Sequence, residues 1–115
     1  MKLIIAGGRD YQFTNDDMLR LDKIHGHAER VTEVVSGGAK GADRCGEQWA
    51  IGMQLPIKRF PADWEKHGKR AGPLRNAEMA AYANAVALFP GGIGTQSMFN
   101  EATKAGITIY DYRNP

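Results

Sequence analysis

The sequence has little of several features that would place a protein in a special class. A single cysteine among 115 residues excludes an internal disulfide and favours a reducing compartment. No apolar run has the length of a membrane span, and no signal-like segment precedes the first apolar stretch. The formal net charge is only +2, too mild to favour a nucleic-acid partner. We therefore expect a cytoplasmic protein with no membrane association.

Residues for metal binding or covalent catalysis are also few. His25 and His27 are two positions apart on an expected helix, so they point away from each other, and His67 lies in a basic segment. Cys45 lies in helix-like sequence, where a small buried hydrophobic role is expected rather than a nucleophilic one. We expect no metal site and no cofactor, and we find no serine, histidine and carboxylate set for nucleophilic catalysis.

What is present is an ordinary globular composition, 43% hydrophobic and 24% charged, which predicts one domain over residues 1–115. Strand-like runs occupy residues 2–6, 31–36, 56–60, 85–89 and 107–111. Helix-like segments lie between them at about 15–28, 42–54, 73–83 and 95–105, and residues 61–72 are expected to form a polar loop. This alternation predicts the α/β class, a Rossmann-like three-layer sandwich with a parallel sheet of about five strands and helices on both faces.

The first helix has a clear start signal. Thr14 or Asn15 is an expected N-cap, and Asp16 and Asp17 follow in the first turn, where negative charge is favourable. The apolar positions at helical spacing are Met18, Leu21, Ile24 and Ala28.

Three strand-like runs end in a pair of glycines and are followed by helix-like sequence. These junctions read Gly7-Gly8-Arg9-Asp10, Gly37-Gly38-Ala39-Lys40-Gly41-Ala42-Asp43 and Pro90-Gly91-Gly92-Ile93-Gly94-Thr95. Glycine lets the backbone approach a phosphate, and the start of a helix offers unpaired N–H groups. Because the carboxyl ends of parallel strands meet at one edge of a sheet, the junctions predict a single anion-binding cleft.

Side chains at the junctions have two readings each. Thr95 either caps the following helix or turns its hydroxyl to a phosphate, and the N–H groups at 94–96 are expected to point into the cleft. Lys40 either pairs with a phosphate or is solvated, and Asp43 either accepts from a ribose hydroxyl or acts at a helix start. Arg9 either binds a phosphate or base, or pairs with Asp10 or Asp43.

The segment 58–75 is rich in lysine and arginine, so it is either a solvated loop or part of an anion site. We expect Arg70 and Arg75 to close over the ligand. Four aromatic residues near loops either sandwich a base or pack in the core: Tyr11, Phe13, Trp64 and Tyr112. None of the glycine loops is a Walker P-loop or a full dinucleotide fingerprint.

A further segment, at the start of the third expected helix, reads Gly72-Pro73-Leu74-Arg75-Asn76-Ala77-Glu78-Met79. On this segment and the three glycine junctions, the chain resembles the SLOG superfamily. This superfamily groups the DNA-processing protein DprA, the LOG phosphoribohydrolases and the YspA-type proteins, and the small YspA-like branch is the best match. The resemblance implies a Rossmann-like fold that binds nucleotides or nucleotide-derived ligands. It also implies a homodimer or higher homo-oligomer, for which the apolar residues of the third helix are candidates: Ala77, Met79, Ala80, Ala81 and Ala83. These residues either form a subunit interface or pack fully on the sheet.

The resemblance also identifies a departure from the LOG enzymes, which cleave the N-glycosidic bond of nucleoside monophosphates. Their motif places an arginine at a helix start, which Arg75 matches, and a glutamate three residues after the threonine of the glycine loop. Met98 occupies that second position here, and methionine cannot handle a proton. Glu78 and Glu101 are the remaining carboxylate candidates, so enzymatic activity is left open, with Arg75, Glu78 and Glu101 as catalytic candidates.

The sequence therefore favours a protein that binds a nucleotide-derived ligand, ADP-ribose-like or a cyclic nucleotide, as a sensor or sequestering module. A LOG-like phosphoribohydrolase and a DprA-like single-stranded DNA-binding protein are the alternatives. The expected ligand-binding residues are Gly7, Gly8, Arg9, Gly37, Gly38, Lys40, Asp43, Arg70, Arg75, Gly91, Gly92, Gly94, Thr95 and Gln96.

Overall fold

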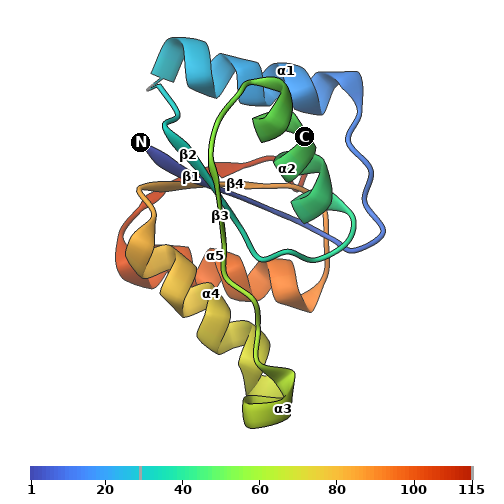
Figure 1. Ribbon diagram of the computed structural model, residues 1–115, viewed down its shortest axis with the longest axis vertical. Coiled ribbons are helices and arrows are strands. Elements are labelled where there is room, and N and C mark those ends of the chain that lie inside the picture. Colours follow the sequence, from blue (N-terminus) through green and yellow to red (C-terminus); the bar gives the residue numbers. More distant parts are fainter. Residues whose placement is uncertain (29, 115) are drawn as a thin grey trace.

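A single parallel sheet organises the chain in the computed structural model, which describes residues 1–28 and 30–114 (Figure 1). The strands are β1 (Lys2–Ala6), β2 (Glu33–Ser36), β3 (Ile57–Arg59), β4 (Ala85–Leu88) and β5 (Thr108–Asp111). Their order is β3-β2-β1-β4-β5, and every neighbouring pair is parallel. The chain moves outward from β1 through β2 to β3 and then crosses to the other side of β1 at β4. This switch point is where open α/β sheets place ligands.

The helices cover both faces of the sheet, which confirms the predicted α/β sandwich. They are α1 (Asn15–Lys23), α2 (Ala42–Gly52), α3 (Trp64–His67), α4 (Ala71–Tyr82) and α5 (Ile93–Ala105), with a π-helical turn η1 (Ile24–Ala28) and a 3-10 turn η2 (Gly68–Arg70). In Figure 1, α1 and α2 lie on one side of the strands, and α4 and α5 lie on the other.

Alternating side chains of β1 divide the core into two halves. Leu3 and Ile5 pack with residues of α1 and α2, whereas Ile4 and Ala6 pack with residues of α4 and α5. All four are buried because β1 is the central strand and both of its faces are covered. Because β1 is parallel to β2 and β4, its glycine pair emerges at the same carboxyl edge of the sheet as the loops after those strands.

The start of α1 matches the expected cap. Thr14 is the N-cap, and it exchanges hydrogen bonds with Asp17 in a capping box. The predicted apolar face is correct for Leu21 and Ile24, which are buried, but Met18 is exposed at 36% because it lies at the edge of the helix contact. The side chains of Ala28 and His27 lie outside the described part of the chain.

The expected polar loop at residues 61–72 is wrong. Asp63 accepts from the backbone N–H of Lys66 at 3.1 Å and so starts α3, and η2 then leads directly into α4. Pro73 still falls in the first turn of α4, where proline is tolerated, but the helix begins two residues before it, at Ala71.

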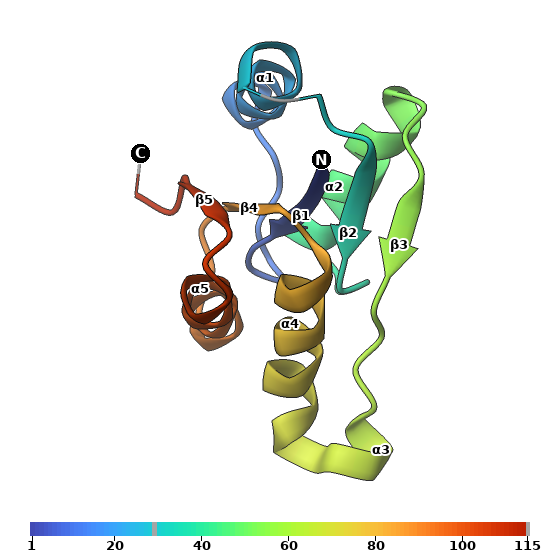
Figure 2. The ribbon, with the colours of Figure 1, turned by 90° about the vertical axis from the view of Figure 1, so that its left-hand side faces the viewer.

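Residues Asp63–Arg70, here called the arm, lie beyond the end of the sheet. Figure 2 shows α3 far from the strands, at the tip of an extended connection that follows β3. None of its residues is buried, so the core does not dictate its composition.

Smaller differences concern the ends of elements. The helix expected at 95–105 begins at Ile93, because Gly92 takes the N-cap position, so Thr95 lies in the first turn and is not the cap. The strands are one to two residues shorter than expected at one or both ends, except β1. Within the described residues, no helix has the length and apolar character needed to cross a membrane.

Candidate functional site

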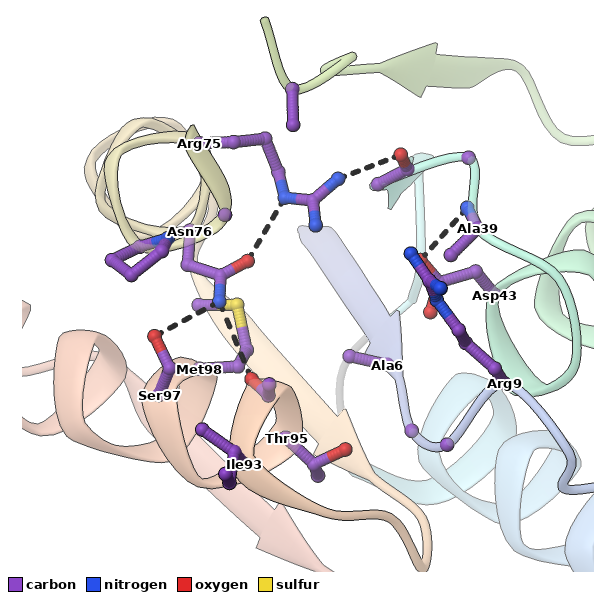
Figure 3. Close-up of a pocket in the computed structure, with 18 of the residues that line it drawn as sticks. Ala6, Arg9, Ala39, Asp43, Arg75, Asn76, Ile93, Thr95, Ser97 and Met98 are labelled. Atoms are coloured by element: carbon purple, nitrogen blue, oxygen red, sulfur yellow. Dashed lines mark hydrogen bonds between the residues drawn. The ribbon is translucent and has the colours of Figure 1, made fainter. Parts of the chain in front are cut away.

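A cleft of about 910 Å³ lies at the carboxyl edge of the sheet, between the loops after β1 and β2 on one side and α4 and the start of α5 on the other (Figure 3). All three glycine junctions contribute to its wall: Gly7 and Gly8, Gly37 and Gly38, and Gly92 and Gly94. The volume is in the range of small-molecule sites. The sequence-based expectation that the junctions converge on one cleft is therefore correct as a matter of geometry.

Backbone contacts at Gly8 hold the three junctions together. Its N–H donates to the carbonyl of Pro90 at 2.9 Å, and its carbonyl accepts from the N–H of Ala42 at 3.1 Å. A Cβ on Gly91 would lie 2.7 Å from the Gly8 nitrogen, and a Cβ on Gly41 would overlap the Gly8 carbonyl oxygen. Gly41 also has a φ of +74°, which L side chains rarely adopt. Several of the glycines therefore serve loop-to-loop packing, which fixes the shape of the cleft floor.

Arg75 crosses the cleft from α4 to the loop after β2. Its Nη1 donates to the Gly37 carbonyl at 2.8 Å and its Nε donates to Asn76 Oδ1 at 3.0 Å (Figure 3). Burial and the nearby Arg9 charge lower the pKa of Arg75, whereas Asp43 opposes this effect. A Cβ on Gly37 would lie 2.6 Å from Arg75 Nη1, so the absence of a side chain at Gly37 makes room for the guanidinium.

Asn76 holds the two helices of this wall in register. Its Nδ2 donates to Ser97 Oγ at 3.2 Å and to the Gly94 carbonyl at 3.4 Å. It therefore connects the first turns of α4 to the first turns of α5, and its oxygen orients Arg75. Asn76 and Ser97 line the cleft, and neither was predicted from the sequence to bind the ligand. The sequence signal that could have identified Asn76 is its position directly after Arg75 at the start of a predicted helix.

Asp43 is a buried carboxyl in the first turn of α2, directly after the loop that follows β2. It is only 7% exposed, and it accepts from the N–H of Ala39 at 3.3 Å. Burial raises the pKa of the Asp43 carboxyl to about 6, although the Ala39 hydrogen bond and the Arg75 charge lower it. Figure 3 shows the Arg9 side chain beside Asp43 on the cleft side. The site thus combines arginine side chains with a carboxyl whose pKa is raised to about 6.

Most of the expected ligand-binding residues line the cleft. These are Gly7, Gly8, Arg9, Gly37, Gly38, Lys40, Asp43, Arg75, Gly92, Gly94 and Thr95. Arg70, Gly91 and Gln96 do not line it. Gln96 points elsewhere, because its amide pairs with Asn100 and Arg113 and its N–H donates to the Gly92 carbonyl. Gly91 packs under the loop, and Lys69 of the arm lines the cleft where Arg70 was expected.

The catalytic candidates are not brought together. Arg75 lines the cleft, but Glu78 is exposed outside it, and Glu101 lies 3.6 Å from Lys104 in an ion pair. Met98 does line the cleft and is 1% exposed, packed in the apolar core under α4 and α5. The position that carries a glutamate in LOG enzymes is therefore a buried thioether in contact with the cleft.

The four aromatic candidates separate clearly. Trp64 lines the cleft and is 52% exposed. Tyr11, Phe13 and Tyr112 instead pack around Phe89 in the core on the α1 and α2 side. The Tyr11 hydroxyl also donates to Asp17, which helps to hold the loop after β1.

Other expectations concern residues away from the cleft. Cys45 is half-buried rather than fully buried, because it lies at the edge of α2 beside Gln12. Over residues 1–28 and 30–114, no group of histidine, cysteine, aspartate and glutamate is arranged to hold a metal ion. On α4, Met79, Ala80 and Ala83 are buried against the sheet, so most of the expected subunit interface is used within the chain.

Comparisons with known proteins identify the family of the chain. A sequence model described as the "YspA, cpYpsA-related SLOG family" matches residues 1–67. The chain belongs to this SLOG family. Membership indicates a nucleotide-related function without naming a ligand. The matched segment contains the first two glycine junctions and Trp64, whereas Arg75 and the third junction lie beyond it.

One curated relative is similar over much of its length. The "Gene 61 protein" of Mycobacterium phage D29 is 45% identical over 87 residues, which cover 69% of this chain and 70% of that protein. Its name states no activity. No solved structure matches the chain.

Proposed function

We propose that this SLOG protein binds a nucleotide or a nucleotide-derived ligand, ADP-ribose-like or a cyclic nucleotide, as a sensor or sequestering module. The convergence of three glycine junctions on one cleft that also holds Arg9 and Arg75 carries the proposal. Backbone without side chains allows a phosphate to come close, and arginine supplies charge with a planar set of donors. Family membership supports the nucleotide class.

The phosphate would bind at the start of α5. Gly92, Gly94 and Thr95 line the cleft there, and the first turn of a helix offers N–H groups and positive dipole. Thr95 is 4% exposed, and a Cβ on Gly91 would overlap its Oγ1, so this hydroxyl lies against the glycine loop. Arg9 and Lys40 from the opposite loops would add positive charge for a second phosphate.

Binding without hydrolysis fits the side chains better than glycosidic cleavage. An N-glycosidic hydrolase needs a carboxylate to stabilise the oxocarbenium-like centre or to move a proton. Met98 does not provide one, and neither Glu78 nor Glu101 reaches the cleft. Asp43 does line the cleft, but it lies in the first turn of α2, across from Met98.

The test combines thermal stability with product analysis. The purified protein is mixed with AMP, ADP-ribose and cyclic ADP-ribose, its melting temperature is measured, and each ligand is then analysed for free adenine. Binding alone predicts a raised melting temperature with ligands recovered intact, since a ligand that binds only the folded state stabilises it. Release of adenine would replace the binding proposal with a hydrolase, and no shift with any of them would contradict the nucleotide site.

Substitutions at Thr95 localise the effect. Thr95→Asp places a negative charge in the cradle and should abolish the shift, whereas Gln96→Asp adds the same charge one residue later, outside the cleft lining. Thr95→Val removes only the hydroxyl and should weaken binding about 10- to 100-fold, the effect of one lost hydrogen bond to a charged group. Equal effects of the Thr95 and Gln96 aspartates would show that the start of α5 is not the phosphate site.

We also propose that the protein forms a homodimer or higher homo-oligomer, as the resemblance implies. Native mass spectrometry measures the subunit number and shows any co-purified ligand in the same spectrum. A monomer at micromolar concentration would contradict this proposal but would not bear on the proposed ligand site.

A further inference from the structure

Trp64 is an exposed aromatic ring at the rim of the cleft. It is 52% exposed, although tryptophan is among the most costly side chains to leave in water. A Cβ on Gly72 would lie 3.3 Å from its Cη2, so one edge of the ring lies against the first turn of α4. The other tryptophan, Trp49, is 3% exposed and donates to Asp22, as expected of a core residue. Trp64 is therefore held in place without being buried.

The part of the cleft around Trp64 differs in character from the part around the glycine loops. Its walls are apolar or lack a side chain, and besides Trp64 they comprise Pro61, Ala62, Gly72 and Pro73. Lys69 is the charged cleft residue that the arm contributes within the described chain. Arg9 and Asp43 lie at the opposite, glycine-loop part. Arg75 lies between the two, since its Nη1 is 2.8 Å from the Gly37 carbonyl and 3.5 Å from the Phe60 carbonyl. One cleft thus joins an anion-binding region to a flat apolar region.

We propose that Trp64 is the base-stacking platform of the site, so that a nucleotide lies with its phosphate on the glycine loops and its base on the indole ring. This inference rests on the proposed function and adds the orientation of the ligand. Every base has a flat π-face, so stacking on tryptophan requires an aromatic base but tolerates its identity. The ribose then lies between the two regions, where Asp43 and Arg75 line the cleft. In this orientation Lys69 lies near the base, whereas the phosphate lies on the first turn of α5.

If the base stacks on Trp64, the arm is a part of the binding site. None of the arm residues is buried, so the packing of the core does not explain why a tryptophan is there. A ligand that stacks on Trp64 would cover exposed apolar surface on the ring and on Pro73, which is the usual source of affinity for a base. Binding should therefore stabilise the contact between the arm and α4.

The experiment compares AMP with ribose 5-phosphate, which differ only by the base, using isothermal titration calorimetry. The wild-type protein should bind AMP more tightly. Trp64→Ala should weaken AMP about 5- to 140-fold, the effect of removing one stacked aromatic, and leave ribose 5-phosphate unchanged. Trp64→Phe keeps a ring and should retain AMP affinity within a few-fold. Ile51→Ala is the matched control, because Ile51 is an apolar residue that is 66% exposed and outside the cleft lining.

Fluorescence gives a second readout. AMP should change the tryptophan emission of the wild-type protein but not that of Trp64→Phe, in which only the core Trp49 remains. Ribose 5-phosphate should change neither.

The outcomes separate the platform from the phosphate site. Equal affinity for AMP and ribose 5-phosphate, or an unchanged AMP affinity in Trp64→Ala, would overturn the platform and leave the phosphate site standing. A Trp64→Ala protein that loses AMP and ribose 5-phosphate equally would also overturn it, because the effect would not depend on the base. If the wild-type protein bound neither molecule, the proposed function itself would fail, and the platform with it.

Discussion

The carboxyl of Asp43 offers a measurable link between the site and the stability of the fold. Its pKa rises from 3.8 to about 6 on folding, chiefly because of burial. Each pKa unit corresponds to about 1.4 kcal/mol, so ionised Asp43 costs the folded state up to about 3 kcal/mol above pH 6. Because the folded pKa is the higher one, the folded state binds the extra proton, and stability falls as the pH rises from about 4 to 6.

Asp43→Asn tests this reasoning. The amide oxygen can still accept from the Ala39 N–H, but the buried charge is gone, so the variant should be more stable than the wild type at pH 8 by up to about 3 kcal/mol. The gain should shrink toward zero as the pH falls to about 2, where the wild-type carboxyl is protonated in both states. The free energy of unfolding is measured by urea titration at several pH values, and the difference between variant and wild type is plotted against pH.

Two results would refute it. A variant less stable than the wild type at pH 8 would show that the Arg75 charge outweighs burial, and a pH-independent difference would show that Asp43 does not titrate in this range. Asp43→Ala is the control. It also removes the buried charge, but it leaves the Ala39 N–H without its acceptor, so its gain in stability should be about 1 to 3 kcal/mol smaller than that of Asp43→Asn. A stabilised Asp43→Asn that binds AMP less tightly would indicate a carboxylate kept for the ligand.

Two further predictions concern the loops around the cleft. Gly37→Ala should destabilise the fold by about 1 to 3 kcal/mol, because its Cβ would lie 2.6 Å from Arg75 Nη1. Gly94→Ala, in the first turn of α5, meets nothing within 4 Å and should not destabilise the fold. Urea titration of both compares them, and equal losses would contradict the role of Gly37. Asp17→Asn should cost about 2 to 3 kcal/mol at pH 7, since Asp17 is 1% exposed and accepts from Tyr11 and Arg20. Burial would raise the pKa of Asp17, but these hydrogen bonds outweigh burial and lower the pKa. The stability that Asp17 contributes should therefore be present above pH 4 and be lost on acidification. If Asp17→Asn destabilised the protein as much at pH 2 as at pH 7, the ion pair would be excluded as the source of the effect.

Much of the fold was predictable because its signals are local. The apolar run of β1 and the periodicity of Leu21 and Ile24 depend only on neighbouring residues, and the structure confirms both. The cap at Thr14 is similarly local. The arm was missed because its short helix has no apolar face, and only the Asp63 cap indicates that it starts there.

The candidate site divides in the same way. Glycine pairs after apolar runs predicted three loops at one edge of the sheet, and these loops do meet at the cleft. Gln96 and Arg70 were placed by proximity in sequence, but helical rotation and the direction of the arm take them away from the cleft. Asn76 was missed because its role depends on Ser97, which is 21 residues away.

By itself the sequence determined the alternation of strands and helices, the position of the glycine junctions and the presence of Met98 after the third of them, since each of these follows from residue type and order. Only the tertiary structure decided which aromatic residue faces the cleft, that Asp43 is buried beside the arginines, and that Arg75 spans the two walls. Those properties depend on distances between residues far apart in the chain. The packing of the helices on the sheet sets these distances, and no local pattern encodes them.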